Sequence, residues 1–334
     1  MLVFFNLIIG NIFKVICLSE RYAVLGALPV AILHPYLLHH QITHTQWHQT
    51  LAEGGCFILA EAAINDAVSW QAERHSGKNE LTRLYWDKAG QIHASISPHI
   101  IPVNQGNWEQ VKEHVLTRNG WGVGVRLSWK HYSRSEETQL QKLSQHLRSW
   151  LLVTTPEQDD VTLRLADWLV VRPLLEASTH PEATAFFGPV AEFWHLAPDG
   201  SAERLELTHP SEHPPNITQP RTLSPLQWQA ILTPSLLNTL QRYMAHLRQH
   251  HPRWHDAENN ELQQFTEHHY QQALEYGFRH DRDIVRYLAL ASELHPGFIG
   301  DAWVQAIMRD AEYTPAGSRM DRLYSKAVEM MDEA

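Results

Sequence analysis

The pattern of apolar and polar positions divides the chain into a mixed first part and a helical second part. Short apolar runs typical of strands occupy residues 56–60, 81–86, 98–103, 121–129, 151–154, 161–165, 191–196 and 204–207. Segments of helical period lie between them, at residues 45–53, 66–75, 108–118, 135–150 and 168–177. Hairpin-like and crossover connections are mixed, so we expect an α+β fold, a mixed α/β sheet with covering helices.

Beyond residue 225 the strand signal disappears, and apolar residues recur every three or four positions. Helices are expected at residues 226–231, 236–250, 256–278, 281–291, 301–308 and 318–331. Each is apolar on one side only, which predicts an all-α helical lobe.

A proline-rich stretch separates the two parts. Residues 208–225 hold prolines at positions 210, 214, 215, 220 and 225, so a helix or a central strand is not expected there. The predicted organisation is an α/β domain at 44–207, a linker of restricted flexibility at 208–225 and a helical lobe at 226–334.

The first 40 residues do not fit this scheme. Residues 1–18 form an apolar run that Asn6, Asn11 and Lys14 interrupt. The run is slightly shorter than the ~20 residues of a membrane span, and it lacks the basic start and the cleavage site of a signal peptide. Three interpretations stay open: a membrane anchor, a core element, or a start codon assigned too far upstream. We treat residues 1–40 as a doubtful leader.

Charge and cysteine content narrow the classes of partner. The formal net charge is -10, and Lys and Arg form no basic cluster, so we expect neither nucleic acid nor a membrane as a partner. Cys17 and Cys56 are the only cysteines, which excludes a disulfide framework and suits the cytoplasm. The 12 tryptophans are typical of cores and protein interfaces.

Motifs that would carry chemistry are weak. The glycine-rich run at 120–124 follows a predicted helix and opens a strand, the reverse of a phosphate loop. The pairs His44/His48 and His251/His255 have helical spacing, but a third metal ligand is not visible.

Acyl transfer and glycoside hydrolysis have equally little support. A nucleophile elbow is absent from the sequence, and Glu61 and Asp66 are a carboxylate pair by spacing alone. We therefore expect no enzyme, no cofactor and no metal site.

Residues 163–190, LRLADWLVVRPLLEASTHPEATAFFGPV, hold the most distinctive constellation. Arg164 and Asp167 precede a helix, and Phe186-Phe187-Gly188-Pro189 precedes a strand. This arrangement resembles the type VI secretion effector adaptors, also called effector chaperones. Residues 57–66, 84–85, 97–98 and 120–128 resemble further parts of that family in the same order. The resemblance covers residues 44–205, with Trp168 where many members have proline.

The resemblance implies a bacterial adaptor in the cytoplasm that binds a cognate toxic effector and promotes its loading onto the VgrG spike. It implies no catalysis by the chain itself. The candidate structural or partner-binding residues are Arg164, Asp167, Trp168, Phe186, Phe187, Gly188 and Pro189.

Two interpretations of Arg164 and Asp167 stay open, a buried ion pair that fixes the corner before the helix, or direct contact with a partner. Two alternative functions also stay open. One is a hydrolase with a site built from scattered residues, and the other is a membrane-anchored scaffold that depends on residues 1–18.

Overall fold

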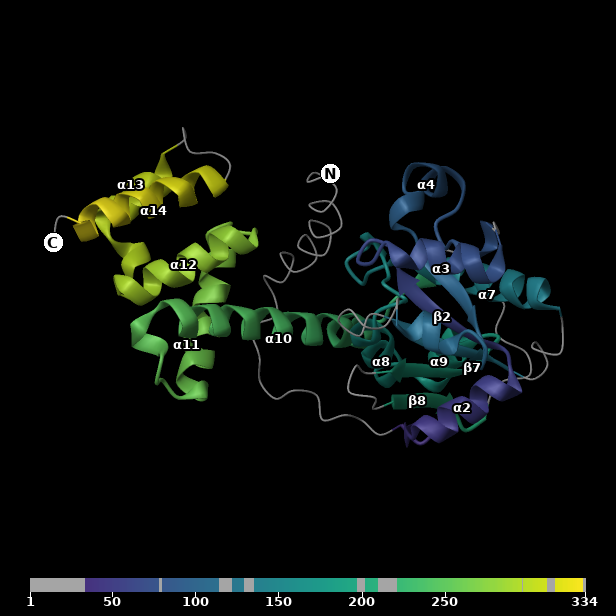
Figure 1. The fold of residues 1–334 in the computed structure, drawn as a ribbon. Coiled ribbons are helices and arrows are strands. Elements are labelled where there is room, and N and C mark those ends of the chain that lie inside the picture. Colours follow the sequence, from purple (N-terminus) through teal and green to yellow (C-terminus); the bar gives the residue numbers. More distant parts are fainter. Residues whose placement is uncertain are drawn as a thin grey trace. The chain divides into compact units, whose positions relative to one another are not determined.

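The computed structural model describes residues 34–77, 80–113, 122–128, 135–196, 202–209, 221–295, 297–310 and 316–332 (Figure 1). Within them the chain divides into two compact units, one that ends at Leu232 and one that begins at Thr233. The first unit is a mixed sheet with helices and the second is helical, so the predicted fold class is confirmed.

A six-stranded antiparallel sheet forms the centre of the first unit. Its strands are β1 (Leu37–Ile42), β2 (Cys56–Glu61), β3 (Pro98–Val103), β4 (Val123–Leu127), β7 (Val190–Leu196) and β8 (Ala202–Leu207). They are ordered β1-β8-β7-β4-β2-β3, and each neighbouring pair is antiparallel. All six residues of β2 are buried, as the continuous apolar run at 56–60 predicts.

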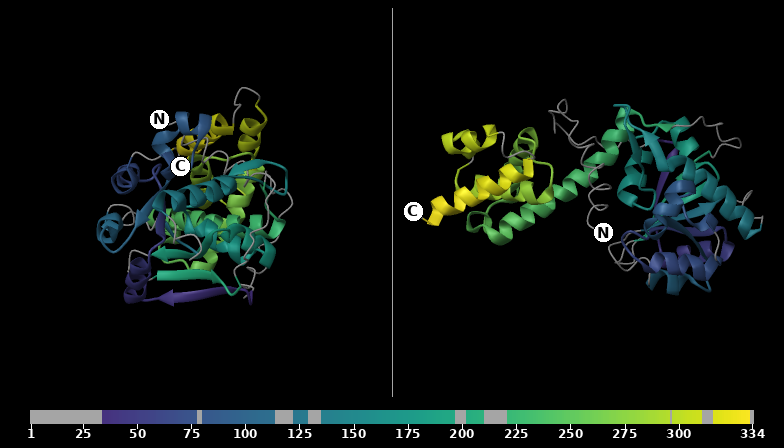
Figure 2. Two further views of the ribbon diagram at one scale, coloured as in Figure 1. Left: turned by 90° about the vertical axis from the view of Figure 1, so that its right-hand side faces the viewer. Right: turned by 90° about the horizontal axis from the view of Figure 1, so that it is seen from above.

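Helices lie against both faces of this sheet (Figures 1 and 2). On one face, strand residues share a buried cluster with helices α2 (His44–Glu53) and α3 (Ala67–Ser76). Members of this cluster include Trp47, Leu51, Ile58, Val68, Ala72, Ile101 and Trp194. On the other face Phe193 of β7 contacts α9 (His180–Phe187).

Side-chain caps explain where several helices begin. Thr43 and Gln46 form a capping box at the start of α2, and Thr179 and Glu182 form another at the start of α9. The Ser135 side chain accepts a hydrogen bond from the backbone of α7 (Glu136–Leu151), as its position in the sequence predicts.

A second, smaller sheet contains β6 (Asp160–Thr162), β5 (Leu152–Thr154) and β9 (Arg221–Thr222), in that order. The β5–β6 hairpin confirms the prediction for residues 151–165. Strand β9 pairs in parallel with β5, so the end of the proline-rich stretch adds to a sheet edge. Residues 210–220 lie outside the described residues, and the linker stays a prediction.

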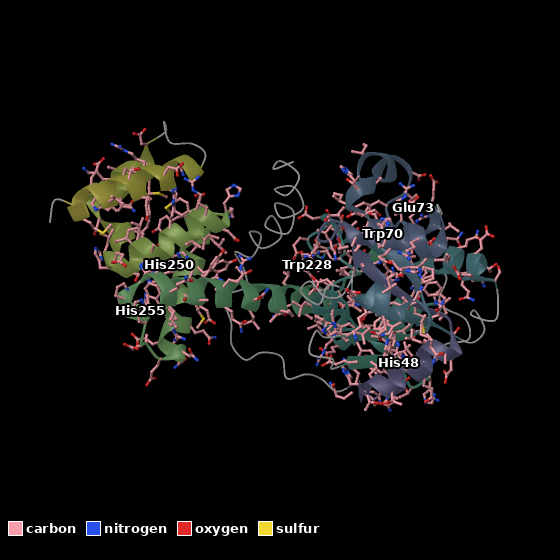
Figure 3. All side chains as sticks on the ribbon, in the orientation of Figure 1. His48, Trp70, Glu73, Trp228, His250 and His255 are labelled. Atoms are coloured by element: carbon pink, nitrogen blue, oxygen red, sulfur yellow. The ribbon has the colours of Figure 1, made fainter. Side chains whose placement is uncertain are left out.

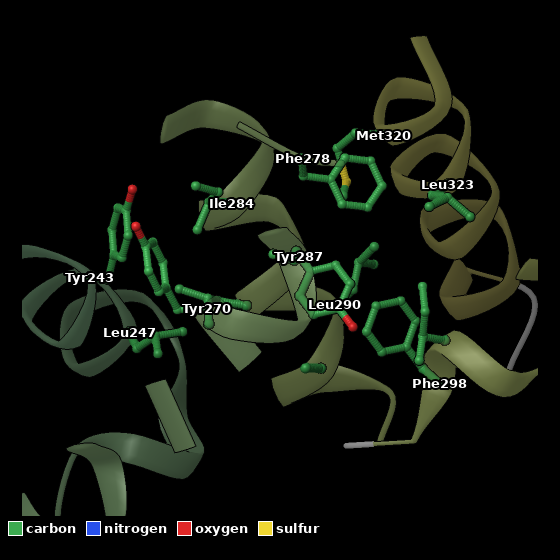
Figure 4. Close-up of a cluster of buried hydrophobic side chains, with 14 of the residues drawn as sticks. Tyr243, Leu247, Tyr270, Phe278, Ile284, Tyr287, Leu290, Phe298, Met320 and Leu323 are labelled. Atoms are coloured by element: carbon green, nitrogen blue, oxygen red, sulfur yellow. The ribbon is translucent and has the colours of Figure 1, made fainter. Parts of the chain in front are cut away.

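The second unit is built from helices that share one core. Its helices are α10 (Pro225–His250, which begins in the first unit), α11 (Asn259–Glu275), α12 (Asp281–Glu293), α13 (Ala302–Arg309) and α14 (Ala316–Asp332). Figure 4 shows the aromatic and aliphatic side chains at the centre. Tyr287 contacts Phe278 and Phe298, with ring centroids 5.9 and 5.1 Å away.

The strand predicted at 81–86 is wrong. The segment contains a 3-10 turn (Glu80–Thr82), and α4 (Asp87–Ile92) begins where a turn was expected. The N–H groups of Leu84 and Tyr85 donate to Pro98 O and Ser97 Oγ. These bonds occupy two N–H groups that a strand would donate to its neighbour. Among the described residues, the bridge between Arg83 and His99 is the one ladder pair that joins this segment to β3.

Two helix predictions also need correction. Residues 226–231 and 236–250 belong to one 26-residue helix, α10, which continues through Pro234. Helix α9 was not predicted, although Thr179, Pro181 and Glu182 are the residues that open a helix.

Several further predictions fall outside the described residues. Of the helix expected at 108–118, the structure describes α5 (Trp108–Val111) and residues 112–113. The glycine-rich run is described only from residue 122. No helix in the described part of the chain is long and apolar enough to cross a membrane. The apolar run at 1–18 lies outside that part.

Candidate functional site

Arg164 and Asp167 lie at the corner where the chain leaves β6 and enters α8 (Trp168–Glu176). Asp167 caps α8, because its Oδ1 accepts a hydrogen bond of 3.0 Å from Leu169 N. Arg164 Nη1 lies 3.6 Å from Asp167 Oδ2. Burial raises the pKa of Asp167, and Arg164 and the Leu169 N–H oppose the rise. The geometry fits the interpretation that this ion pair fixes the corner.

Two further titratable groups interact with this corner. Glu61, at the end of β2, is buried, and burial with some repulsion from Asp167 raises its pKa to about 7, against the effect of Arg164. Burial, with Glu61, raises the pKa of Tyr85 to about 12. The corner therefore holds a buried carboxyl group that changes its charge near neutral pH.

Sequence reasoning weighed Glu61 only with Asp66. The structure leaves Asp66 exposed and Glu61 buried. The signal that could have found the corner is that Glu61 is a carboxylate ending an otherwise fully apolar strand. In the part of the chain that the structure describes, no group of three His, Cys, Asp or Glu side chains could hold a metal ion.

Trp168 connects α8 to β7 and β8. Its Nε1 donates to Glu203 Oε2 over 3.2 Å, and its ring stacks on His195 with centroids 5.4 Å apart. Arg172, one turn later in α8, lies 3.0 Å from the same Glu203 oxygen. Sequence reasoning did not identify Glu203, His195 or Arg172.

Phe186 and Phe187 are core residues, each only 2% exposed. Phe186 meets Trp150 edge-on at 4.8 Å, and both phenylalanines contact Phe193 of β7, at 5.3 and 5.0 Å. Neither ring is available to a partner without unfolding of α9.

Gly188 ends α9 under tight steric constraint. Its φ is +51°, which side-chain-bearing residues rarely adopt, and a Cβ at this position would overlap the ring of His146. His146 Nε2 donates to Phe186 O over 2.7 Å, and burial lowers the pKa of His146 to about 4. Pro189 then directs the chain into β7, and its carbonyl accepts a 3.0 Å bond from Ser128 N.

The two parts of the motif, residues 164–168 and 186–189, thus both contact strand β7. Phe193 contacts the two phenylalanines, and His195, two residues later on the same face of β7, stacks on Trp168. The candidate residues form a packed framework around β7 rather than an open contact surface.

Exposed side chains suited to partner contact lie elsewhere in the first unit. Trp70 on α3, labelled in Figure 3, is 48% exposed. Trp86, just before α4, is 41% exposed. The Arg74 guanidinium lies 5.2 Å from the Trp70 ring centroid, and that of Arg148 lies 5.8 Å from the Trp86 ring centroid. Trp and Arg are the residue types that contribute most to binding at protein interfaces.

Comparison with known protein families gives a match in the first unit. The model of a family described as a domain of unknown function, DUF4123, matches residues 56–185. No curated protein and no solved structure matched the chain. The matched range contains Arg164, Asp167 and Trp168 and ends one residue before Phe186. The match lies within the first unit, so this part of the chain is similar to DUF4123 domains, a family associated with effector adaptors of the type VI secretion system.

Proposed function

We propose that the chain is a type VI secretion adaptor that binds a cognate toxic effector and promotes its loading onto the VgrG spike. The observation that carries the proposal is the DUF4123 match over residues 56–185. The adaptor is proposed to act in the bacterial cytoplasm and to catalyse no reaction.

The packing of the motif residues supports this function. Asp167 and Gly188 hold the two ends of the α8–α9 region in place, and the phenylalanines are part of the core. A framework of this kind presents fixed surfaces to a partner, which lowers the entropy cost of binding. Trp70 and Trp86, each beside a guanidinium, are the proposed contact residues.

The test is co-expression of the full chain with the effector encoded beside it and with VgrG, followed by affinity capture on a tag of the chain. Capture of the effector, and of VgrG in its presence, is expected. Absence of a complex with either protein would refute the proposal.

Hydrolysis is the second candidate function, and Glu61 is the residue with which to test it. Burial raises the pKa of Glu61 to about 7, in the range of a general acid or base, and the same burial keeps the carboxyl group from solvent in this structure. If the chain is a hydrolase, Glu61→Gln abolishes turnover and leaves effector capture intact. If Glu61→Gln loses neither turnover nor effector capture, Glu61 has only a structural role at the corner before α8.

A further inference from the structure

Helix α4 is carried by a loop between two buried anchors, Leu84 and Ser97. Both residues are fully buried, and no side chain that the structure describes between them is buried. Trp86, just before α4, is 41% exposed, and Ile92, its last residue, is 67% exposed. We call residues 85–96 the α4 loop, which lies at the periphery of the first unit (Figure 1). A segment with so little buried surface depends on polar contacts to keep one conformation.

Backbone contacts fix the turn at the start of the α4 loop. Asp87 has φ of +50°, which is uncommon for a residue other than glycine. Gly90 N donates to Trp86 O over 2.9 Å, and a Cβ at Gly90 would lie 2.7 Å from Tyr85 O. Tyr85 N in turn donates to Ser97 Oγ over 3.0 Å. These contacts are internal to the loop and its anchors, so they fix its shape but do not attach it to another element.

Arg148 of α7 connects the start of the α4 loop to the body of the first unit. Its Nη2 donates to Glu80 O over 3.0 Å and to Arg83 O over 2.8 Å. These carbonyl groups lie in and directly after the 3-10 turn that precedes the loop. The same guanidinium lies 5.8 Å from the Trp86 ring centroid. One side chain of α7 therefore binds the backbone before the loop and contacts the ring at its start.

The charge of Arg148 strengthens these contacts. Burial lowers the pKa of Arg148, and Asp87 and Glu80 oppose the decrease. A guanidinium stays protonated at neutral pH, and its hydrogen bonds to carbonyl groups are stronger than those of a neutral donor. Replacement of Arg148 by a neutral side chain therefore weakens the backbone bonds and the ring contact together.

We propose that Arg148 is a positioning residue that holds Trp86 in one orientation for contact with the effector. Arg148 itself does not touch the effector and acts through the Trp86 ring. The proposal deepens the adaptor function and rests on it for the identity of the partner. The order of the α4 loop in the free chain does not depend on a partner, so it can be measured separately.

Hydrogen exchange of the full chain, followed by mass spectrometry, tests the effect on the loop. In Arg148→Gln a peptide covering residues 85–90 should exchange at least about tenfold faster, because the loop opens more often without its external contact. Peptides from β2 and β7 should be unchanged. Arg148→Lys keeps the charge without the planar donor geometry and should give an intermediate rate. Arg242→Gln, a matched change at a side chain of the second unit that is 58% exposed, should leave the loop as in wild type.

Effector affinity tests whether Arg148 acts through Trp86. The probe is the purified effector encoded beside the chain. Arg148→Gln should weaken its binding at least about threefold in the wild-type chain and less than about 1.5-fold in a Trp86→Ala chain, because no ring remains to be positioned. A purely structural role of Arg148 would weaken binding equally in both backgrounds. Arg148→Lys should recover part of the affinity that Arg148→Gln loses.

Three results overturn the proposal: an unchanged loop peptide in Arg148→Gln, faster exchange throughout the first unit, or equal losses of affinity in the two backgrounds. If Arg148→Gln does not fold, Arg148→Lys takes its place in both measurements. If the wild-type chain captures no effector, the adaptor function is refuted, and hydrogen exchange still decides whether Arg148 positions the loop.

Discussion

At the residue scale, steric constraint at Gly188 decides how α9 meets β7. The position combines φ of +51° with the His146 ring in the space of a Cβ. Gly188→Ala should therefore lower the free energy of unfolding by about 2–4 kcal/mol, from backbone strain and overpacking together. Urea unfolding followed by circular dichroism measures the change.

Gly54 provides the control for backbone strain alone. Its φ is +85°, and a Cβ there would meet nothing within 4 Å. Gly54→Ala should cost about 1–3 kcal/mol, and less than Gly188→Ala, because backbone strain is its only cause. Equal losses at Gly54 and Gly188 would show that His146 yields to the added methyl group.

Glu61 gives a pH-dependent prediction. Its pKa is about 7 in the folded state against 4.5 as the ordinary value, so folding takes up a proton between these pH values. The wild-type chain therefore loses stability from this group as pH rises from 4.5 to 7. Glu61→Gln should be more stable than wild type at pH 8, by on the order of 2 kcal/mol, and similar to it near pH 4.5.

The difference between variant and wild type is the quantity to measure. Burial lowers the pKa of His99, His146 and His269 to about 4, so these groups reduce the stability of the fold as pH falls. The Glu61→Gln variant keeps all three histidines, so their contribution is the same in both proteins. Exposed Glu157→Gln is the matched control and should show no such pH dependence. A pH-independent effect of Glu61→Gln would contradict the prediction.

The sequence identified the residues of the motif but not their roles. Arg164, Asp167 and Gly188 were named through the resemblance of residues 163–190 to the effector adaptors. Whether they contact a partner or each other depends on burial, which a single sequence does not report. Glu61 and His146 were not assigned to the motif because they meet it only in the folded chain. Arg164 lies 103 residues after Glu61 (164 − 61), and Phe186 lies 40 residues after His146.

At the element scale, strong local signals gave correct predictions and short segments did not. The buried run of β2 and the Ser135 cap of α7 follow directly from residue type. The segment 81–86 has the composition of a strand, but its backbone groups bond to the turn before β3 instead. Tertiary hydrogen bonding of this kind overrides local propensity.

Pro234 shows the same effect in α10. A proline normally ends a helix, since it removes one hydrogen bond and crowds the preceding turn. Here α10 continues for 16 residues beyond it, with Leu240 and Leu247 buried in the core of the second unit. Packing of these residues offsets the local cost.

Pro234→Ala should therefore raise the stability of α10. The expected gain in the free energy of unfolding is up to about 3 kcal/mol, and a rise in the thermal midpoint measures it. Asn238→Ala, an exposed position of the same helix, should gain less than about 1 kcal/mol. A gain at Pro234 no larger than at Asn238 would mean that α10 bends to accommodate the proline.

At the scale of the whole molecule, fold class was predictable because it depends on the order of many elements rather than on one boundary. The loss of strand signal after residue 225 was enough to predict a helical second part. The position of the division was harder to predict, since α10 passes through it without a break in helical pattern. The contact surface was harder still, because exposed Trp70 and Trp86 look like core residues in a single sequence.

The adaptor function makes a direct prediction for these two tryptophans. The double variant Trp70→Ala and Trp86→Ala should lower effector affinity roughly tenfold or more, because each ring is exposed and oriented by a neighbouring arginine. Surface plasmon resonance with the purified effector measures the loss.

The matched control replaces exposed leucines of the same unit, Leu152→Ala and Leu169→Ala, and should change affinity less than threefold. Thermal midpoints close to wild type are required of both double variants, since neither removes core contacts. Equal losses in the two variants would indicate a diffuse binding surface. Unchanged affinity in both would move the effector site away from α3 and α4, and the second unit would be the next place to test.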